Sequence, residues 1–459
     1  MKTLSLEEVV KAVSGNLISA NGRIPVINGI STDSRNMKTG DLFFALKGKQ
    51  YNGHQFVPQA IHAGAAAVVV SEENKSELKN KDCPVIRVSD TITALGDLAK
   101  YYRQKLDTKI IGITGSTGKT TTKEMAYHLL SHFGHTVRSQ KSFNNFIGVP
   151  LTLFEIENNH RYGILEMGTN APGELKRLSG IGNPDVAVIL TISKAHLEGL
   201  GDIEGVARAK AEILENLRSN GVFVYNADNS WCVKIAGSFR GMSVSFGFSP
   251  SSLIRCTEVK KRENSYNLVI NHYLEVSFPV TGYHNIHNCL ASFAICHALG
   301  QDLRNLKEAF SSFELPSMRM EQQTIGAFTI INDAYNANPE SVSAALQYLN
   351  EIDTKGRKVF ICGDMLELGQ ESALLHKEIG EKVARFTIDL LWTVGDHAYE
   401  IAKAAKLSGM PEERIMSFKN VDGISDSELH HLQENDVIVI KGSRSMHMEN
   451  IIKKLKGYL

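Results

Sequence analysis

Short apolar runs alternate with helix-like segments along most of this 459-residue chain. The runs stand at residues 29–34, 41–46, 66–70, 110–113, 162–166, 185–190, 328–331, 358–362, 388–394 and 436–440. Helical patterns occupy the stretches between many of them, as at residues 56–64. Buried strands that alternate with helices are typical of parallel, doubly wound sheets. The pattern therefore predicts an α/β fold.

The grouping of these runs divides the chain into three predicted domains. A small α/β N-terminal domain covers residues 1–100, a central domain with a parallel sheet covers 101–316, and a Rossmann-like C-terminal domain covers 317–459. Most strands of the last two domains run into glycine, aspartate or asparagine. Ligands of open α/β sheets bind at such carboxyl ends. We therefore expect the central domain to hold a ligand that the last domain covers.

Composition narrows the classes of partner. Lys and Arg together number 50, as do Asp and Glu, and the basic residues form no long cluster. This balance argues against nucleic acid or an anionic membrane as the main partner. The six cysteines show no C-x-x-C spacing, so we expect free, buried thiols in a reducing compartment. Acids among the first ten residues, and the lack of any apolar run near ~18 residues, predict a cytoplasmic protein without a membrane segment.

A glycine-rich turn at residues 112–121 (GITGSTGKTT) follows one of the predicted strands and leads into a helix-like segment. Such a turn aims backbone N–H groups at an anion, here from Gly115, Ser116, Thr117, Gly118 and Thr121. Lys119 would reach the β- and γ-phosphates of a nucleotide, and the Thr120 hydroxyl would bind Mg²⁺. Ile113 stands where the strict pattern G-x-x-x-x-G-K-[ST] has its first glycine, so a structural turn with a chance lysine stays an alternative. We expect a variant phosphate loop and hence a P-loop-type central domain.

Two further candidates follow the next strands. Glu166 ends the run at 162–166, where a P-loop protein places an acidic Mg²⁺ partner. His196 follows the run at 185–190. A lone histidine after a strand is more often a surface or core residue, but two strand-end candidates beside one phosphate loop favour a metal site. We therefore expect a site for two Mg²⁺ ions.

Several motifs together resemble those of the Mur ligases of peptidoglycan synthesis, in the same order along nearly the whole chain. They are residues 112–121 (GITGSTGKTT), 142–149 (SFNNFIGV), 165–168 (LEMG), 196–198 (HLE), 209–213 (AKAEI), 282–291 (GYHNIHNCLA), 317–320 (SMRM) and 332–341 (NDAYNANPES).

The resemblance implies an activity. Residues 31–35 (STDSR) and 40–48 (GDLFFALKG) are similar to the uridine-nucleotide domain shared by the third and fourth amino-acid-adding enzymes of the family. The DNPR segment typical of the third is absent, whereas residues 363–369 (GDMLELG) and 441–444 (KGSR) resemble the fourth. The implied reaction joins D-alanyl-D-alanine to UDP-N-acetylmuramoyl-tripeptide, with ATP consumed through an acyl phosphate.

The same resemblance implies roles for individual residues. Thr120 and Glu166 would hold one Mg²⁺, and His196 a second, together with Lys210 carbamylated by CO₂; from spacing alone Lys210 is an ordinary surface lysine. ATP would also contact Asn288, Arg319, Asp333 and Asn336, although Asp333 and Asn336 alone suggest an Asx turn before a helix. The peptide substrate would contact Asn144 and Asn145, and its uridine nucleotide Ser31, Asp33 and Arg35. The dipeptide pocket is weakly marked, near Asp364, Glu367 and Lys441.

Other functions stay open at this point. One alternative is a Mur-type ligase that adds a single amino acid as the third residue. A second is a folylpolyglutamate synthase-like ligase, which would lack the uridine-binding segment at 31–35. A third is a P-loop regulatory switch, which would not need His196 and Asn288. We expect a monomer, and the sequence does not specify whether the tripeptide ends in lysine or diaminopimelate.

Overall fold

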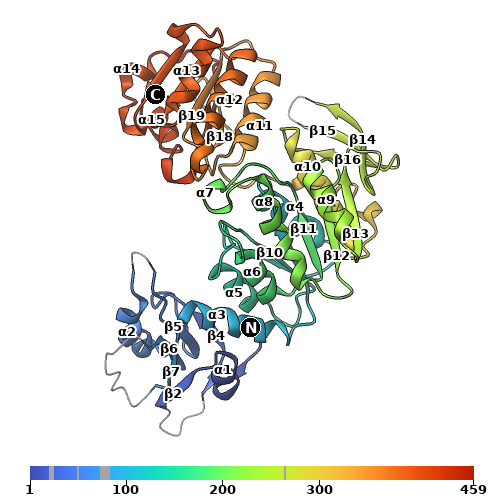
Figure 1. Ribbon diagram of the computed structural model, residues 1–459, viewed down its shortest axis with the longest axis vertical. Coiled ribbons are helices and arrows are strands. Elements are labelled where there is room, and N and C mark those ends of the chain that lie inside the picture. The colour runs from blue at the N-terminus through green and yellow to red at the C-terminus, as the bar shows by residue number, and fades with distance from the viewer. Residues whose placement is uncertain (20–24, 49–50, 73–82, 263–264, 459) are drawn as a thin grey trace.

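Three open sheets, each built from one stretch of the chain, follow one another along the long axis of the molecule (Figure 1). The computed structural model describes residues 1–19, 25–48, 51–72, 83–262 and 265–458. We name the N-terminal, central and C-terminal units after their sheets of five, nine and six strands. The predicted α/β fold class is confirmed.

The N-terminal unit has the strand order β2-β7-β6-β5-β4, in which β4 to β7 are parallel and β2 is antiparallel. A short antiparallel pair, β1 and β3, lies beside it. The strands are β1 (Leu4–Ser5), β2 (Asn16–Ser19), β3 (Val26–Ile27), β4 (Gly29–Ser31), β5 (Asp41–Phe44), β6 (Ala67–Ser71) and β7 (Val85–Val88). The helices are α1 (Leu6–Ala12), α2 (Val57–His62) and α3 (Thr91–Arg103).

The central unit has the strand order β16-β15-β14-β13-β12-β11-β8-β10-β9. Its strands are β8 (Lys109–Thr114), β9 (Thr136–Arg138), β10 (Tyr162–Glu166), β11 (Val186–Ile189), β12 (Val222–Asn226), β13 (Met242–Gly247), β14 (Ile254–Lys261), β15 (Tyr266–Ile270) and β16 (Leu274–Phe278). Its helices are α4 (Lys119–Leu130), α5 (Gly148–Phe154), α6 (Glu174–Gly182), α7 (Leu197–Leu200), α8 (Ile203–Ala211), α9 (Ser230–Ser238) and α10 (His284–Ala298). Strands β8 to β14 are parallel, whereas β14 to β16 form an antiparallel meander.

The C-terminal unit has the strand order β17-β18-β22-β19-β20-β21, parallel except for β17. Its strands are β17 (Glu321–Ile325), β18 (Phe328–Asp333), β19 (Lys358–Gly363), β20 (Leu390–Val394), β21 (Ile415–Phe418) and β22 (Val437–Lys441). Its helices are α11 (Pro339–Glu351), α12 (Ser372–Arg385), α13 (Tyr399–Leu407), α14 (Asp426–Leu429) and α15 (Asn450–Tyr458). Among the helices of the described ranges, none is long and apolar enough to cross a membrane.

Apolar side chains cover both faces of the central sheet, because successive residues of a strand point to opposite faces. In β8, Ile110 packs with one buried cluster, and Ile111 and Ile113 pack with the other. The first cluster includes residues of α3, α5 and α6, and the second includes residues of α4 and α10. The site-bearing strand β8 is therefore buried between β10 and β11 and covered on both sides.

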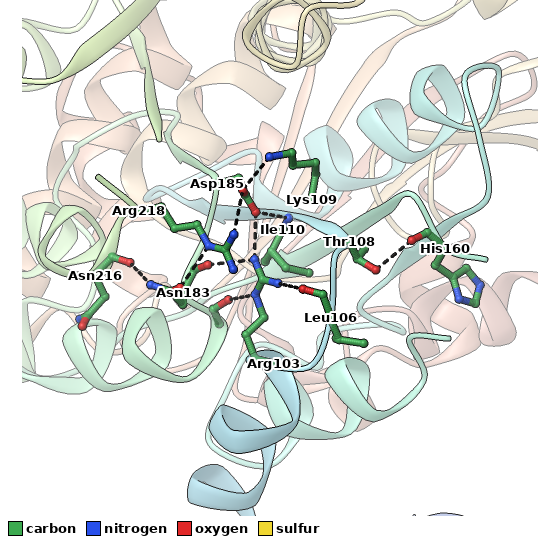
Figure 2. A network of polar contacts seen from close by, with 11 residues as sticks. Arg103, Leu106, Thr108, Lys109, Ile110, His160, Asn183, Asp185, Asn216 and Arg218 are labelled. Atoms are coloured by element: carbon green, nitrogen blue, oxygen red, sulfur yellow. Dashed lines mark hydrogen bonds and ion pairs between the residues drawn. The ribbon is translucent and has the colours of Figure 1, made fainter. Parts of the chain in front are cut away.

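A buried polar network joins α3 to the opposite, amino-terminal edge of this sheet (Figure 2). Arg103, at the end of α3, is 2.9 Å from the Asp185 carboxylate and donates hydrogen bonds to the carbonyls of Leu106, Gly182 and Asn183. Asp185 also accepts from the Ile110 N–H at 3.0 Å. Burial lowers the pKa of Arg103 to about 10. Because α3 runs through residue 100, the predicted boundary at 100/101 falls inside a helix that is fixed to the central unit.

Candidate active site

A cavity of about 490 Å³ is lined by residues of the central and C-terminal units. The phosphate loop after β8, the ends of β10 and β18, and the starts of α10 and α11 all contribute to it. The predicted site residues that line it are Ser116, Thr117, Gly118, Lys119, Thr120, Thr121, Asn144, Asn145, Glu166, His196, Asn288, Arg319, Asp333 and Asn336. The fold thus gathers most of the predicted site from segments more than 200 residues apart.

The loop before α4 has the geometry of an anion site. Gly118 is the residue before the helix and has φ +81°, a left-handed conformation that disfavours other residues. A Cβ added there would lie 2.3 Å from Asn288 Oδ1, so any other residue would force the Asn288 side chain to move. The Lys119 ammonium donates to the Gly115 carbonyl at 2.7 Å. Burial lowers the pKa of Lys119. The negative charge of Glu166 raises this pKa, and the positive charge of Arg319 lowers it further.

Hydroxyl and carboxylate oxygens lie together beside this loop. Thr120 Oγ1 is 2.9 Å from Glu166 Oε2, and Glu166 is 2% exposed. Asn144 Nδ2 donates to Glu166 Oε1 at 3.1 Å, and Arg319 donates to Thr120 Oγ1 at 2.8 Å. Within the described ranges, no group of three or more His, Cys, Asp or Glu side chains could hold a metal. The Thr120 hydroxyl and the Glu166 carboxylate are oxygen donors of the kind that fits Mg²⁺, which is commonly held by one or two carboxylates together with substrate phosphates and water.

His196 and Lys210 lie in different surroundings. His196 lines the cavity at the start of α7, and its Nδ1 is 2.5 Å from the Glu367 carboxylate of the C-terminal unit. This contact with His196 is the main reason that the pKa of Glu367 is lowered. Lys210, in α8, is 2% exposed and does not line the cavity. Burial, and next the charge of Lys119, lower the pKa of Lys210 to about 7, and no hydrogen bond or ion pair of its amine occurs within the described residues.

The C-terminal unit contributes a cationic pair of side chains to the cavity. Arg319 lies over the Tyr335 ring, with 4.1 Å between the guanidinium carbon and the ring centre. Lys441, at the end of β22, contacts the Asp333 carboxylate at 2.5 Å and the Asn336 carbonyl at 3.1 Å. Lys441 therefore lies with the predicted nucleotide residues. Asp364 does not line this cavity, and its carboxylate accepts from the Ala398 N–H at 2.6 Å.

Several polar side chains that line the cavity were not predicted from the sequence, and three of them have informative contacts. Asn338 caps α11 and also donates to the Ser116 carbonyl at 3.3 Å. Glu340 accepts from Thr117 Oγ1 at 3.3 Å. Asp228 accepts from His287 at 2.9 Å, next to the Asn288 helix. Asn338 and Glu340 lie inside the 332–341 motif, which was the available signal, whereas Asp228 stands in no motif that we recognised.

The two asparagines of the 142–149 motif have different partners. Asn144 holds Glu166, as described above, and its carbonyl accepts from the Gly168 N–H. Asn145 Oδ1 accepts from the N–H groups of Ile147 and Gly148 and so shapes the turn before α5. Both line the cavity, so the loop before α5 forms part of its wall.

The predicted uridine residues form a separate group in the N-terminal unit. Ser31 ends β4, and its hydroxyl donates to the Asp33 carbonyl at 2.9 Å. Arg35 forms a two-pronged pair with Asp33, and this pair lowers the pKa of Asp33 to about 2. None of the three lines the cavity. They lie after a strand of the N-terminal sheet, at a carboxyl end where such sheets bind ligands.

Comparisons with known proteins agree along the chain. Residues 26–103 match the model "Mur ligase family, catalytic domain", residues 113–296 the Mur ligase middle domain, and residues 318–444 the "Mur ligase, glutamate ligase domain". The UDP-N-acetylmuramoyl-tripeptide–D-alanyl-D-alanine ligase of Bacillus subtilis is 35% identical over 453 residues, 98% of each chain. A crystal structure of MurF from Acinetobacter baumannii aligns with TM-score 0.88 and 31% identity, covering 100% of this chain and 99% of the other. The MurF ligase of Thermotoga maritima in complex with ADP aligns with TM-score 0.81 and 25% identity over 94% of this chain and 97% of that one. The chain is a member of the Mur ligase family.

Proposed function

We propose that this protein joins D-alanyl-D-alanine to UDP-N-acetylmuramoyl-tripeptide and converts ATP to ADP and phosphate. The observation that carries the proposal is the cavity in which a phosphate loop, a buried carboxylate and cationic side chains of the C-terminal unit meet. The relatives named for this reaction cover nearly the whole chain, which supports the same substrates here.

The reaction has two steps. The terminal carboxylate of the tripeptide attacks the γ-phosphorus of ATP, so that an acyl phosphate forms and ADP leaves. The amine of D-alanyl-D-alanine then attacks the acyl carbon, an amide forms, and phosphate leaves while the amine loses a proton. A free carboxylate is a poor acylating agent, and phosphorylation supplies its leaving group. The protein contributes position and charge stabilisation to both steps.

Different residues of the site bind the phosphates, the Mg²⁺ ion, the rest of the nucleotide and the peptide. Lys119 and the N–H groups of the loop bind the phosphates, and Arg319 stabilises the negative charge from the C-terminal side. Thr120 and Glu166 would hold a Mg²⁺ ion, which would supply positive charge at the transferred phosphoryl group. Asn288, Asp333 and Asn336 bind the rest of the nucleotide, and Asn144 and Asn145 bind the peptide.

A second Mg²⁺ would be held by His196 and carbamylated Lys210. CO₂ reacts with a neutral amine, and because burial lowers the pKa of Lys210 to about 7, a substantial part of this amine is neutral near pH 7. The product is an anionic oxygen donor, which suits a hard cation better than an ammonium does. The buried position of Lys210 beside Lys119 supports this assignment.

The remaining assignments concern the uridine nucleotide of the UDP-tripeptide and the compartment in which the protein acts. Ser31, Asp33 and Arg35 would bind the uridine nucleotide, because they follow a strand end of the N-terminal sheet. All six cysteines are buried free thiols, which supports a cytoplasmic setting.

Phosphate release tests the proposal against its rivals. The enzyme should release phosphate from ATP only when UDP-tripeptide and D-alanyl-D-alanine are both present. Turnover with a single amino acid, or with a folate and glutamate, would instead favour a different ligase of this fold. Release of phosphate without either acceptor would indicate a nucleotide switch.

A further inference from the structure

Residue Glu367 joins the C-terminal unit to a candidate metal ligand of the central unit. Its carboxylate lies 2.5 Å from His196 Nδ1, and its backbone carbonyl accepts from the Glu198 N–H at 3.1 Å. Both partners of Glu367 therefore belong to the start of α7. The side chain of Glu367 is 53% exposed and that of His196 is 21% exposed, so burial alone does not impose the contact.

The backbone at both ends of this contact is in an unusual conformation. His196 has φ +55° and Glu367 has φ +63°, and both angles lie in the left-handed region that residues other than glycine seldom adopt. Such conformations persist where the surroundings fix them, and they cluster at functional sites. An ordinary surface ion pair between two flexible side chains would need neither of them.

The neighbouring residues hold the same two segments together. Lys194 and Glu371 form an ion pair at 2.7 Å across this junction. Gly369, with φ +57°, lies so close to α7 that an added Cβ would be 3.3 Å from the backbone of Glu198. The loop 367–369 therefore packs on the start of α7, which Figure 1 shows at the end of the central unit nearest the C-terminal unit.

We infer that Glu367 is a positioning residue for His196: it fixes the imidazole with Nδ1–H toward the carboxylate and leaves Nε2 as the metal-binding nitrogen. A histidine that binds a metal usually donates its other ring N–H to such a partner, which sets the tautomer and the ring orientation. Because Glu367 comes from the C-terminal unit, His196 is fully oriented only when that unit sits on α7. The inference rests on the proposed function, since that function places Mg²⁺ at His196.

Binding of Mn²⁺ as a probe for Mg²⁺ tests the role of Glu367. The full-length enzyme is mixed with UDP-tripeptide and a non-hydrolysable ATP analogue, and free Mn²⁺ is measured by electron paramagnetic resonance. Glu367→Ala should weaken one Mn²⁺ site about 10- to 100-fold. Glu367→Gln should weaken it less, because the amide oxygen can still accept from Nδ1–H. The KM for D-alanyl-D-alanine is measured for both variants as well, because the sequence analysis placed Glu367 near the dipeptide pocket.

Glu371→Gln is the matched control, because it breaks the Lys194 ion pair at the same junction without touching His196. It should leave Mn²⁺ binding as in the wild type. Equal weakening by Glu371→Gln would show that only the stability of the junction matters, and would overturn the inference. So would unchanged Mn²⁺ binding in Glu367→Ala, or a rise in the KM for the dipeptide alone. Ligation by the wild-type enzyme is measured in the same preparation. If the wild type does not ligate, the proposed function itself is refuted. If it ligates and the Glu367 variants bind Mn²⁺ as the wild type does, only the inference is refuted.

Discussion

Replacement of Lys210 by methionine should stabilise the protein while removing its activity. The Lys210 amine is buried and has no hydrogen-bond or ion-pair partner among the described residues. An unpaired buried ammonium is unfavourable, so folding near neutral pH must remove a proton from it. Methionine has a similar length and no charge, and it avoids this cost. The variant should therefore have a more stable central unit and, at the same time, no ligase activity.

The size and the sign of the effect follow from the pKa. Lys210 has its pKa lowered from 10.5 to about 7 in the folded protein. Between these two values the unfolded chain binds more protons than the folded one, so the stability of the lysine form rises with pH. The cost is about 4 kcal/mol near pH 7.5 and falls by about 1.4 kcal/mol for each pH unit up to the unfolded value. The advantage of Lys210→Met should shrink accordingly and vanish near pH 10.5.

Thermal unfolding in CO₂-free buffer without Mg²⁺ measures this difference. Trp231 in α9 reports on the central unit once Trp392, the other tryptophan, is replaced by phenylalanine. For a unit of this size, about 1 kcal/mol corresponds to roughly 2–4 °C in the midpoint. The gap between the two forms should therefore narrow by about 5–10 °C from pH 7.5 to 9.5.

A second buried lysine supplies the control. Lys123 is fully buried, but its amine donates to the carbonyls of Ser139 and Lys141 and lies 3.5 Å from Glu166. Lys123→Met leaves these groups without their cation, so it should destabilise the protein by about 3 kcal/mol or more. If Lys210→Met is less stable than the parent near pH 7.5, or if its advantage does not change with pH, the account of Lys210 is wrong.

Three further variants test other parts of the structure. Lys119→Ala should abolish ligation but leave the affinity for UDP-tripeptide, measured by calorimetry, within about 2-fold of the wild type. The reason is that ATP and the uridine nucleotide are assigned to different units. Wild-type turnover in this variant would exclude a role of Lys119 in binding the phosphates of ATP. Asp185→Ala should lower the stability of the central unit by about 3–5 kcal/mol in the same Trp231 assay, because Arg103 stays buried without its carboxylate; a loss below about 1 kcal/mol would show that the network in Figure 2 is not a stabilising anchor. Lys210→Ala should be nearly inactive and should recover part of its turnover in acetate or formate, whereas full activity in CO₂-free buffer would exclude the carbamate.

Apolar runs predicted β8, β10 and β11, because these strands are buried on both faces and leave a continuous signal, whereas β9, β12 and β13 were not predicted. The antiparallel strands β14 to β16 were not predicted, because their buried and exposed positions alternate, as in Leu274–Phe278. That alternation is the mark of an antiparallel sheet with one covered face, and its apolar content is too low to stand out as a run.

The site residues, too, were predictable only in part. Residues within one motif, such as Lys119 and Thr120, are neighbours in the chain, so their chemistry can be predicted from spacing. The contact of Asn338 with Ser116 joins positions 222 residues apart, and that of His196 with Glu367 joins positions 171 apart. Both depend on how the C-terminal unit sits on the central one. Motif spacing carries no information about that arrangement, so these contacts emerged only from the structure.

Transfer of an oxygen isotope tests the central claim most directly. The terminal carboxylate of UDP-tripeptide is labelled with ¹⁸O and incubated with the enzyme, ATP, Mg²⁺ and D-alanyl-D-alanine, and the product and the released phosphate are analysed by mass spectrometry. If the carboxylate attacks the γ-phosphorus, each ligated product should be accompanied by a phosphate that carries one labelled oxygen. Ligated product with unlabelled phosphate would contradict the acyl-phosphate route, and labelled substrate recovered without any ligated product would contradict the assignment as a ligase.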